Sequence, residues 1–139
     1  MKFSKIDQYC INHSTEESKA LIEIREYTQK NESAPAMISG PLVVNFLKNV
    51  IQLSNSKSIL EIGMFTGYSA LGMAEVLSKN GKINTCELCP IHINTAQKFF
   101  NKFKYNNLIT IHEGPAIDTL NTFPIRSFDL VFIDADKTN

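Results

Sequence analysis

The segment FIDADK, residues 132–137, carries the densest group of chemically active side chains in the sequence. An apolar run over 130–133 leads directly into Asp134, Asp136 and Lys137. Carboxylates are ligands that hard divalent cations such as Mg²⁺ prefer, and a lysine whose pKa is lowered beside a cation can act as a general base. The alternative is a solvated strand end without chemistry. We expect an active-site cluster, because groups of this kind gather at functional sites.

Two glycines form a second feature, in the segment LEIGMFTGYSA. Gly63 and Gly67 stand between a predicted strand and a predicted helix, where a missing Cβ allows a tight turn and a close approach of the backbone to a ligand. The spacing is G-x-x-x-G, and Phe65 takes the place of the second glycine of a dinucleotide fingerprint. No G-K-[ST] follows, which excludes a nucleoside-triphosphate loop. The pattern alone is equally compatible with a plain helix-entry turn.

Glu87 ends the second predicted strand. An acid at this position can accept hydrogen bonds from both hydroxyls of a ribose, although an isolated acid at a strand end is more often simply solvated. Together with the glycine loop, Glu87 favours a nucleoside cofactor, and Phe65 disfavours a nicotinamide dinucleotide. The C-x-x-C pair, Cys86 and Cys89, lacks the second pair that a zinc site needs. Among the scattered histidines, even His112 near a strand end is expected to be structural.

Strands and helices alternate along the second part of the sequence. Short apolar runs predict strands over 57–63, 82–87, 108–114 and 128–136. Helical spacing and end signals predict helices over 68–80, 91–103 and 116–120. This alternation is typical of β–α–β units in an α/β fold with a parallel sheet. Ligands of such sheets bind beyond the carboxyl ends of the strands, which is where the glycine loop, Glu87 and the Asp-x-Asp-Lys cluster fall.

The first part of the sequence is predicted to be helical. Apolar residues recur at helical spacing over 14–30 and 41–53, and Pro35 interrupts the two patterns. With 139 residues the chain is long enough for one core and too short for two. We therefore expect a single domain, with N-terminal helices over 1–56 and the sheet over 57–139.

Composition excludes several classes of function. Fourteen basic and fourteen acidic residues balance, so the charge composition does not indicate binding to nucleic acid. The longest apolar runs are far shorter than the ~18 residues of a membrane helix, and the N-terminus lacks the features of a secretory signal. The chain has 3 cysteines, an odd number that indicates reduced thiols and a cytoplasmic protein.

The motifs ILEIGMFTGYSAL and FIDADK resemble those of the cation-dependent O-methyltransferases, class I enzymes that include catechol and caffeoyl-CoA O-methyltransferases. MISGPLVVNFL and YCINHSTEESKALIEI resemble other segments of that family, so the resemblance covers nearly the whole chain. It implies a Rossmann-like class I methyltransferase fold with helices on both faces of a parallel sheet. It also implies transfer of a methyl group from S-adenosylmethionine to a hydroxyl of a small catechol-like or caffeoyl-CoA-like aromatic, with a divalent cation, Mg²⁺ being expected.

The resemblance implies a set of cofactor-binding residues. Glu61 and Gly63 would line the methionine portion of S-adenosylmethionine. Ser69 would hydrogen-bond the carboxylate of that portion, and Ser39 would contact the same end from the preceding segment. Glu87 would hold the ribose, as its place at a strand end also predicts.

The remaining implied residues surround the adenine and the reaction centre. Ala116 would place a backbone amide near the adenine. Asp134 would be the metal ligand and, with Asp136, would support the cofactor side of the pocket. Lys137 would be the catalytic base beside the hydroxyl to be methylated. Since a cation bound to both oxygens of a catechol favours ionisation of the hydroxyl, this set of groups suits O-methylation.

The sequence departs from the family in its extent. Family members continue beyond the fourth strand and include an Asp-Asn pair that completes the metal site. We therefore expect a truncated or split gene product, or a fragment, without the C-terminal strands and with the fourth strand left as an exposed apolar edge. The alternative function is an inactive cofactor-binding fragment or half of a split methyltransferase. Expected partners are the aromatic substrate and either a second copy or a complementary C-terminal half.

Overall fold

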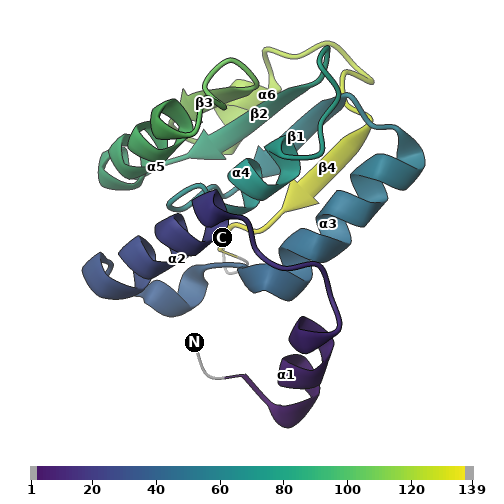
Figure 1. Ribbon diagram of the computed structural model, residues 1–139. Helices are drawn as coiled ribbons and strands as arrows, with labels where there is room; N and C mark the ends of the chain where they lie inside the picture. Colours follow the sequence, from purple (N-terminus) through teal and green to yellow (C-terminus); the bar gives the residue numbers. More distant parts are fainter. Residues whose placement is uncertain (1–2, 137–139) are drawn as a thin grey trace.

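The computed structural model describes residues 3–136, and its centre is a parallel sheet (Figure 1). In this part of the chain the strand order is β3-β2-β1-β4, and all neighbouring strands run parallel. The strands are β1 (Ser58–Ile62), β2 (Lys82–Glu87), β3 (Ile109–Glu113) and β4 (Leu130–Ile133). The predicted α/β class and all four predicted strands are confirmed.

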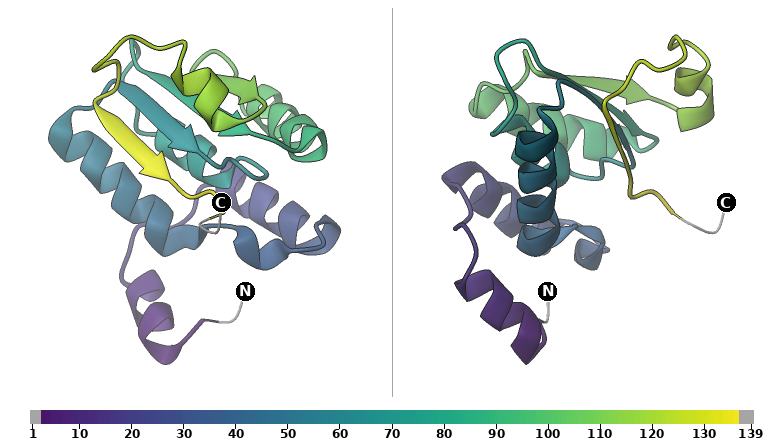
Figure 2. Two further views of the ribbon diagram at one scale, coloured as in Figure 1. Left: turned by 180° about the vertical axis from the view of Figure 1, so that it is seen from behind. Right: turned by 90° about the vertical axis from the view of Figure 1, so that its right-hand side faces the viewer.

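Helices lie on both faces of the sheet, as expected, but unequally. In Figure 2, α3, α4 and α5 cover one face, while α6 alone covers the other within residues 3–136. The helices are α1 (Lys5–Asn12), α2 (Lys19–Asn31), the 3₁₀ turn η1 (Pro35–Met37), α3 (Gly40–Ser54), α4 (Tyr68–Ala74), α5 (Pro90–Lys102) and α6 (Ala116–Leu120).

Three helices differ from the sequence prediction. Helix α2 begins at Lys19 with Ser18 as its N-cap, several residues after the predicted start at 14. Helix α1 lies within the region expected to hold N-terminal helices, 1–56, but no pattern predicted it separately. It begins with a capping box in which Ser4 and Asp7 satisfy each other's backbone amides, a device that stabilises even a short helix. Helix α4 ends at Ala74, well before Gly81, the predicted end. The amides of Val76 and Leu77 bond three residues back, to Met73 and Ala74, so the chain leaves the α-helix through tighter turns.

The main core lies between the sheet and helices α3 to α5. Parallel register aligns Ile59 of β1 with Ile83 of β2 and with Leu130 of β4, and Ile83 with Ile109 of β3. Because side chains alternate along a strand, these residues share the face that α4 covers. Ile59 and Ile83 are completely buried there. This layer holds the strand ends, and with them the site, in a fixed relation.

Strand β4 forms one edge of the described sheet. Its inward-facing residues, Leu130 and Phe132, pack against the core. Val131 and Ile133 alternate with them and are 49% and 63% exposed. The predicted exposed apolar edge is therefore present in the described part of the chain.

One stretch, Pro35–Ser54, is long and apolar enough to cross a membrane by length and composition. This departs from the sequence analysis, in which no apolar run approached that length. The stretch comprises η1 and α3, and Val44, Leu47 and Ile51 are buried in the core. Core helices of soluble proteins pass the same test, and the buried face accounts for the apolar character of α3.

Candidate functional site

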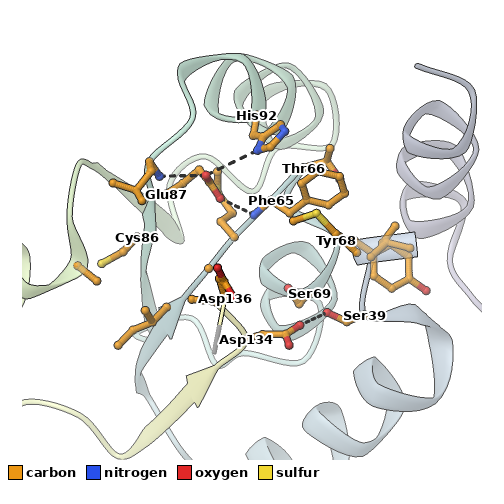
Figure 3. A pocket seen from close by; sticks show the side chains of 18 of the residues that line it. Ser39, Phe65, Thr66, Tyr68, Ser69, Cys86, Glu87, His92, Asp134 and Asp136 are labelled. Carbon is orange, nitrogen blue, oxygen red and sulfur yellow. Dashed lines mark hydrogen bonds and ion pairs between the residues drawn. The ribbon is translucent and has the colours of Figure 1, made fainter. Parts of the chain in front are cut away.

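A cavity of about 290 Å³ opens at the carboxyl ends of β1, β2 and β4 (Figure 3). Of the predicted site residues, the wall contains Ser39, Gly63, Ser69, Glu87, Ala116, Asp134 and Asp136. Glu61 is not in the wall, and Lys137 lies outside the described residues. Segments that are far apart in sequence thus meet where a parallel sheet is expected to bind its ligand.

Gly63 allows a close crossing of two parts of the backbone. Its φ is +93°, and a Cβ built on it would lie 2.6 Å from the backbone N of Ala135 and 2.7 Å from its Cα. The glycine was expected to make room for a ligand, and it does line the cavity. The atoms that would meet its Cβ belong to the protein itself, at the end of β4. Gly63 is therefore required for β4 and the glycine loop to meet.

The second glycine of the loop fits the plainer interpretation, a helix-entry turn. Gly67 also has a φ of +93°, and a Cβ there would lie 2.7 Å from Cζ of Phe100 in α5. Between the glycines, Phe65 has a φ of 52°, an uncommon conformation for a bulky residue. The buried hydroxyls of Thr66 and Thr28 are 2.8 Å apart and tie the loop to α2. The loop is thus fixed from both sides.

Glu87 is held rigidly in the cavity wall. Its Oε2 accepts a hydrogen bond from the amide of Phe65 at 2.7 Å. Its Oε1 accepts from the amides of Leu88 and Cys89, each at 2.9 Å. The carboxylate therefore links the glycine loop to the turn before α5. Carboxylate oxygens have lone pairs beyond those that these amides occupy, so Glu87 can still accept hydrogen bonds from a ligand.

His92 is a site residue that the sequence analysis missed. Its Nδ1 lies 3.6 Å from Oε1 of Glu87, and its Nε2 lies 3.5 Å from Oε2 of Glu32. Its ring meets that of Phe65 edge to face, with centroids 4.6 Å apart. The only sequence signal was its place in the first turn of the helix after Glu87. His112, in contrast, bonds Asn84 and lies away from the cavity wall, in agreement with the structural role expected for it.

Glu61 lies beneath the cavity and is fully buried. Its carboxylate accepts hydrogen bonds from the hydroxyls of Ser69 and Thr85. Burial raises the pKa of Glu61 from 4.5 to about 7, although both hydroxyls oppose the shift; Asp134 and Glu87 add to it. The position differs from the expected one in the wall beside the methionine portion. Ser69 is itself in the wall, with its hydroxyl directed to Glu61.

Asp134 joins the end of β4 to the start of α3. Its amide donates to the carbonyl of Ile62 at 2.9 Å, and Ser39 Oγ donates to its Oδ2 at 2.9 Å. Figure 3 shows both side chains at the same end of the cavity, with Asp136 nearer the middle. Ser39 was expected to contact the cofactor; it lines the cavity, and its hydroxyl holds the carboxylate that was predicted to bind metal.

The described residues do not complete a metal site. Among residues 3–136, no group of three or more His, Cys, Asp and Glu side chains is placed to hold an ion. Mg²⁺ requires near-octahedral oxygen coordination, commonly with more than one carboxylate or with substrate oxygens. Asp134 with Ser39 is short of that set, so the cation remains a prediction, and no reaction step is derived through it.

A parallel sheet with a glycine loop after its first strand and a fixed acid at the end of its second is typical of α/β domains that bind nucleosides. Within that class, the model of a family described as O-methyltransferase matches residues 11–139. The chain belongs to this family, as its motifs indicated.

Known relatives align with nearly the whole length of this chain. It is 35% identical to the catechol O-methyltransferase of Niastella koreensis, over 97% of this chain and 62% of that protein. It is 31% identical to the probable caffeoyl-CoA O-methyltransferase 1 of Dictyostelium discoideum, over 97% of this chain and 60% of that protein. The chain thus spans less than two thirds of the length of these relatives.

Solved structures show the same fold. The SAH-bound methyltransferase PaMTH1 of Podospora anserina matches with a TM-score of 0.87 and 30% identity, over 97% of this chain and 60% of its own. The O-methyltransferase of Bacillus cereus in complex with SAH matches with a TM-score of 0.86 and 29% identity, over 96% of this chain and 62% of its own. The Rossmann-like class I methyltransferase fold expected from the resemblance is confirmed.

The crossing at Gly63 leads to a first prediction. Gly63→Ala and Gly114→Ala both place a Cβ on a residue with positive φ. Only the Cβ at position 63 would clash with backbone atoms, because a Cβ at position 114 would have no atom within 4 Å. Left-handed strain alone costs about 1–2 kcal/mol, and overpacking against Ala135 adds about 1–3 kcal/mol for Gly63→Ala. Urea unfolding of the two variants measures the difference. Equal losses of stability would show that the crossing is not tight.

Glu61 leads to a prediction about pH. Its raised pKa means that the unfolded chain ionises first, near pH 4.5, and the folded chain only near pH 7. The contribution of Glu61 to stability is therefore complete below pH 4.5 and declines as the pH rises to about 7, by about 3 kcal/mol for a shift of this size.

The variant Glu61→Gln isolates this contribution, because it keeps the shape of the side chain and cannot ionise. We expect the difference in the free energy of unfolding between wild type and variant to change across pH 4.5–7, with the wild type losing stability relative to the variant. Urea unfolding at several pH values measures it. Parallel profiles for the two proteins would contradict the raised pKa.

Proposed function

We propose that this chain binds S-adenosylmethionine and takes part in methyl transfer to a hydroxyl of a small aromatic such as a catechol. The observation that carries the proposal is the carboxylate of Glu87, which the amide of Phe65 in the glycine loop holds in the wall of the cavity. Family membership and the SAH-bound structures of similar proteins support it.

The cavity offers separate places for the parts of the cofactor. Glu87 would accept hydrogen bonds from the ribose hydroxyls, because its position is set by backbone amides and not by a flexible partner. The amide of Gly114 donates to the carbonyl of Glu87 at 3.0 Å, so the turn before α6 lies next to the ribose end, and Ala116 would border the adenine. Ser39 and Ser69 would border the methionine end, on the opposite side of Gly63.

Bound S-adenosylmethionine supplies a methyl group on a positively charged sulfur. In the proposed reaction the acceptor oxygen bonds that methyl carbon as the carbon–sulfur bond breaks, and the hydroxyl proton passes to a base, for which Lys137 remains the prediction. The walls of the cavity would contribute alignment, which accounts for much of the rate in such displacements. Asp134, held by Ser39 and by the backbone of β1, would mark the acceptor side.

A second candidate is binding of the cofactor without methyl transfer. It is favoured by the incomplete set of metal ligands in the described residues. The proposal also includes an aromatic acceptor, the use of Mg²⁺ and a cytoplasmic location of the protein. The cytoplasmic location is supported by the cysteines, which form no disulfide: Cys10, Cys86 and Cys89.

An assay of catechol methylation distinguishes the two candidates. With S-adenosylmethionine and Mg²⁺, the purified chain is expected to form a methylated product, and EDTA is expected to reduce the rate by about 100-fold or more, because a Lewis acid contributes several kcal/mol. A rate of product formation that does not change when EDTA is added would contradict the role of the cation. Cofactor binding with no product would favour the second candidate.

Calorimetric titration with S-adenosylhomocysteine tests the cofactor site. We expect Glu87→Ala to weaken binding by about 10- to 100-fold, since hydrogen bonds to a charged group contribute about 1.5–3 kcal/mol. Glu113→Ala is the matched control: Glu113 ends β3 in register with Glu87 but lies outside the cavity wall, and its loss should leave affinity unchanged. Equal effects of the two variants, or equal binding of NAD, would contradict the assignment.

A further inference from the structure

His92 lies between two carboxylates, one of them in the wall of the cavity. Its Nδ1 is 3.6 Å from Oε1 of Glu87, and its Nε2 is 3.5 Å from Oε2 of Glu32. Both distances are within ion-pair range but exceed the roughly 3.2 Å of an N–H···O hydrogen bond. The ring therefore acts on the two carboxylates through its charge, which it carries only when both nitrogens are protonated. Figure 3 shows the contact with Glu87 beside Phe65.

In the described part of the chain, no other cation pairs with these two carboxylates. The ion pairs of lysine and arginine in residues 3–136 lie elsewhere and join Arg25 to Glu17, Lys48 to Glu75 and Lys102 to Glu23. The side chains of Glu32 and Glu87 are 12% and 11% exposed, and that of His92 is 21% exposed. Water and salt therefore screen the three groups only in part. Without a charged ring between them, Glu32 and Glu87 would repel each other uncompensated.

His92 also brings three separate segments together at Glu87. Glu32 is the residue at which α2 ends, and Glu87 is the last residue of β2. The ring of His92 meets that of Phe65, in the glycine loop, edge to face. The amide of Phe65 is the donor that holds Oε2 of Glu87. His92 thus acts on Glu87 directly, through charge, and indirectly, by packing against the residue that hydrogen-bonds it.

The helix dipole opposes a positive charge at the position of His92. The residue lies in the first turn of α5, which contains no acid, and the N-terminal end of a helix favours negative charge. Carboxylates from outside the helix therefore have to offset the dipole when the ring is protonated. Glu32 and Glu87, which come from two other elements, meet that requirement.

We propose that His92 is a positioning residue, whose protonated ring, paired with Glu32 and Glu87, holds the carboxylate of Glu87 in the orientation that receives the ribose. The inference rests on the proposed function, in which Glu87 binds that ribose. When the ring loses its proton, Glu32 and Glu87 repel each other and backbone amides alone hold Glu87. The affinity for the cofactor is therefore expected to fall as the pH rises through the range in which histidines ordinarily change charge, about pH 5–8.

Other titratable groups of the cavity have to be separated from His92. The wall also contains Tyr68, Cys86, Asp134 and Asp136, and Glu61, with a pKa of about 7, lies beneath it. A variant that lacks only the histidine keeps all of these groups. The difference between its pH profile and that of the wild type therefore reports His92.

Calorimetric titration with S-adenosylhomocysteine at about pH 6 and about pH 8 tests the inference. The variant His92→Gln keeps a polar side chain and cannot carry a charge. We expect it to weaken binding about fivefold at the lower pH and less than about twofold at the higher, as the loss of one partly shielded ion pair does. His112→Gln is the matched control: His112 bonds Asn84 and lies outside the cavity wall, so this variant should follow the wild type at both pH values.

A second substitution separates charge from packing. In His92→Gln the repulsion between Glu32 and Glu87 remains, and adding Glu32→Gln removes it. The double variant is therefore expected to recover most of the affinity lost at the lower pH. Lost packing of the ring on Phe65 would not be recovered in this way. Thermal unfolding of each variant confirms that folded protein is titrated.

Each result bears either on His92 or on the cofactor site as a whole. Equal pH dependence of the wild type and His92→Gln, or a double variant that binds no better than His92→Gln, would overturn the role of His92. The proposed function would survive both results as long as Glu87→Ala weakens binding. Absence of S-adenosylhomocysteine binding by the folded wild type would instead refute the cofactor site, and the role of His92 with it.

Discussion

The backbone of β4 and the backbone of the glycine loop cross so closely at Gly63 that no side chain fits between them. The other features of the site depend on this contact. It places Asp134 and Asp136 beside a loop that lies about seventy residues earlier in the chain, and it closes one side of the cavity. A residue with a Cβ would separate the two segments, and positive φ at this position adds a second reason for glycine.

The opposite side of the cavity is fixed by hydrogen bonds to Glu87. Backbone amides from the glycine loop and from the turn before α5 converge on Glu87, while His92 lies between Glu87 and Glu32. Under the floor, Glu61 is buried with two hydroxyl donors. Glu87 in the wall of the cavity and Glu61 buried beneath it thus lie near the ends of neighbouring strands in different environments.

The buried side of the sheet and its exposed edge differ in how rigidly they are held. The layer of isoleucines between the sheet and α4 holds the strand ends rigidly, which suits a preorganised cofactor site. The opposite face and the β4 edge are covered only in part among residues 3–136, and apolar side chains remain exposed there. Asp134, which follows β4 directly, lies next to that edge.

Much of this protein followed from sequence alone, because the deciding interactions are local. Alternation of apolar runs and helical patterns determined the strands and the parallel sheet, and the motifs around Gly63 and Asp134 determined the family. Glu87 was found because a strand end has a known place in such a sheet. Helix α1 was not predicted separately within the N-terminal helical region, because its cap involves only the two side chains of Ser4 and Asp7.

Tertiary structure decided what depends on distant neighbours. Gly63 must lack a Cβ because the backbone of Ala135 lies against it. Ser39 is directed to Asp134, and His92 lies in the wall because α5 packs beside the glycine loop. Glu61 lies beneath the cavity because parallel register brings Thr85 next to it while α4 supplies Ser69. These relations join residues that are up to 95 positions apart, and the pattern of one segment holds no information about which other segment folds against it.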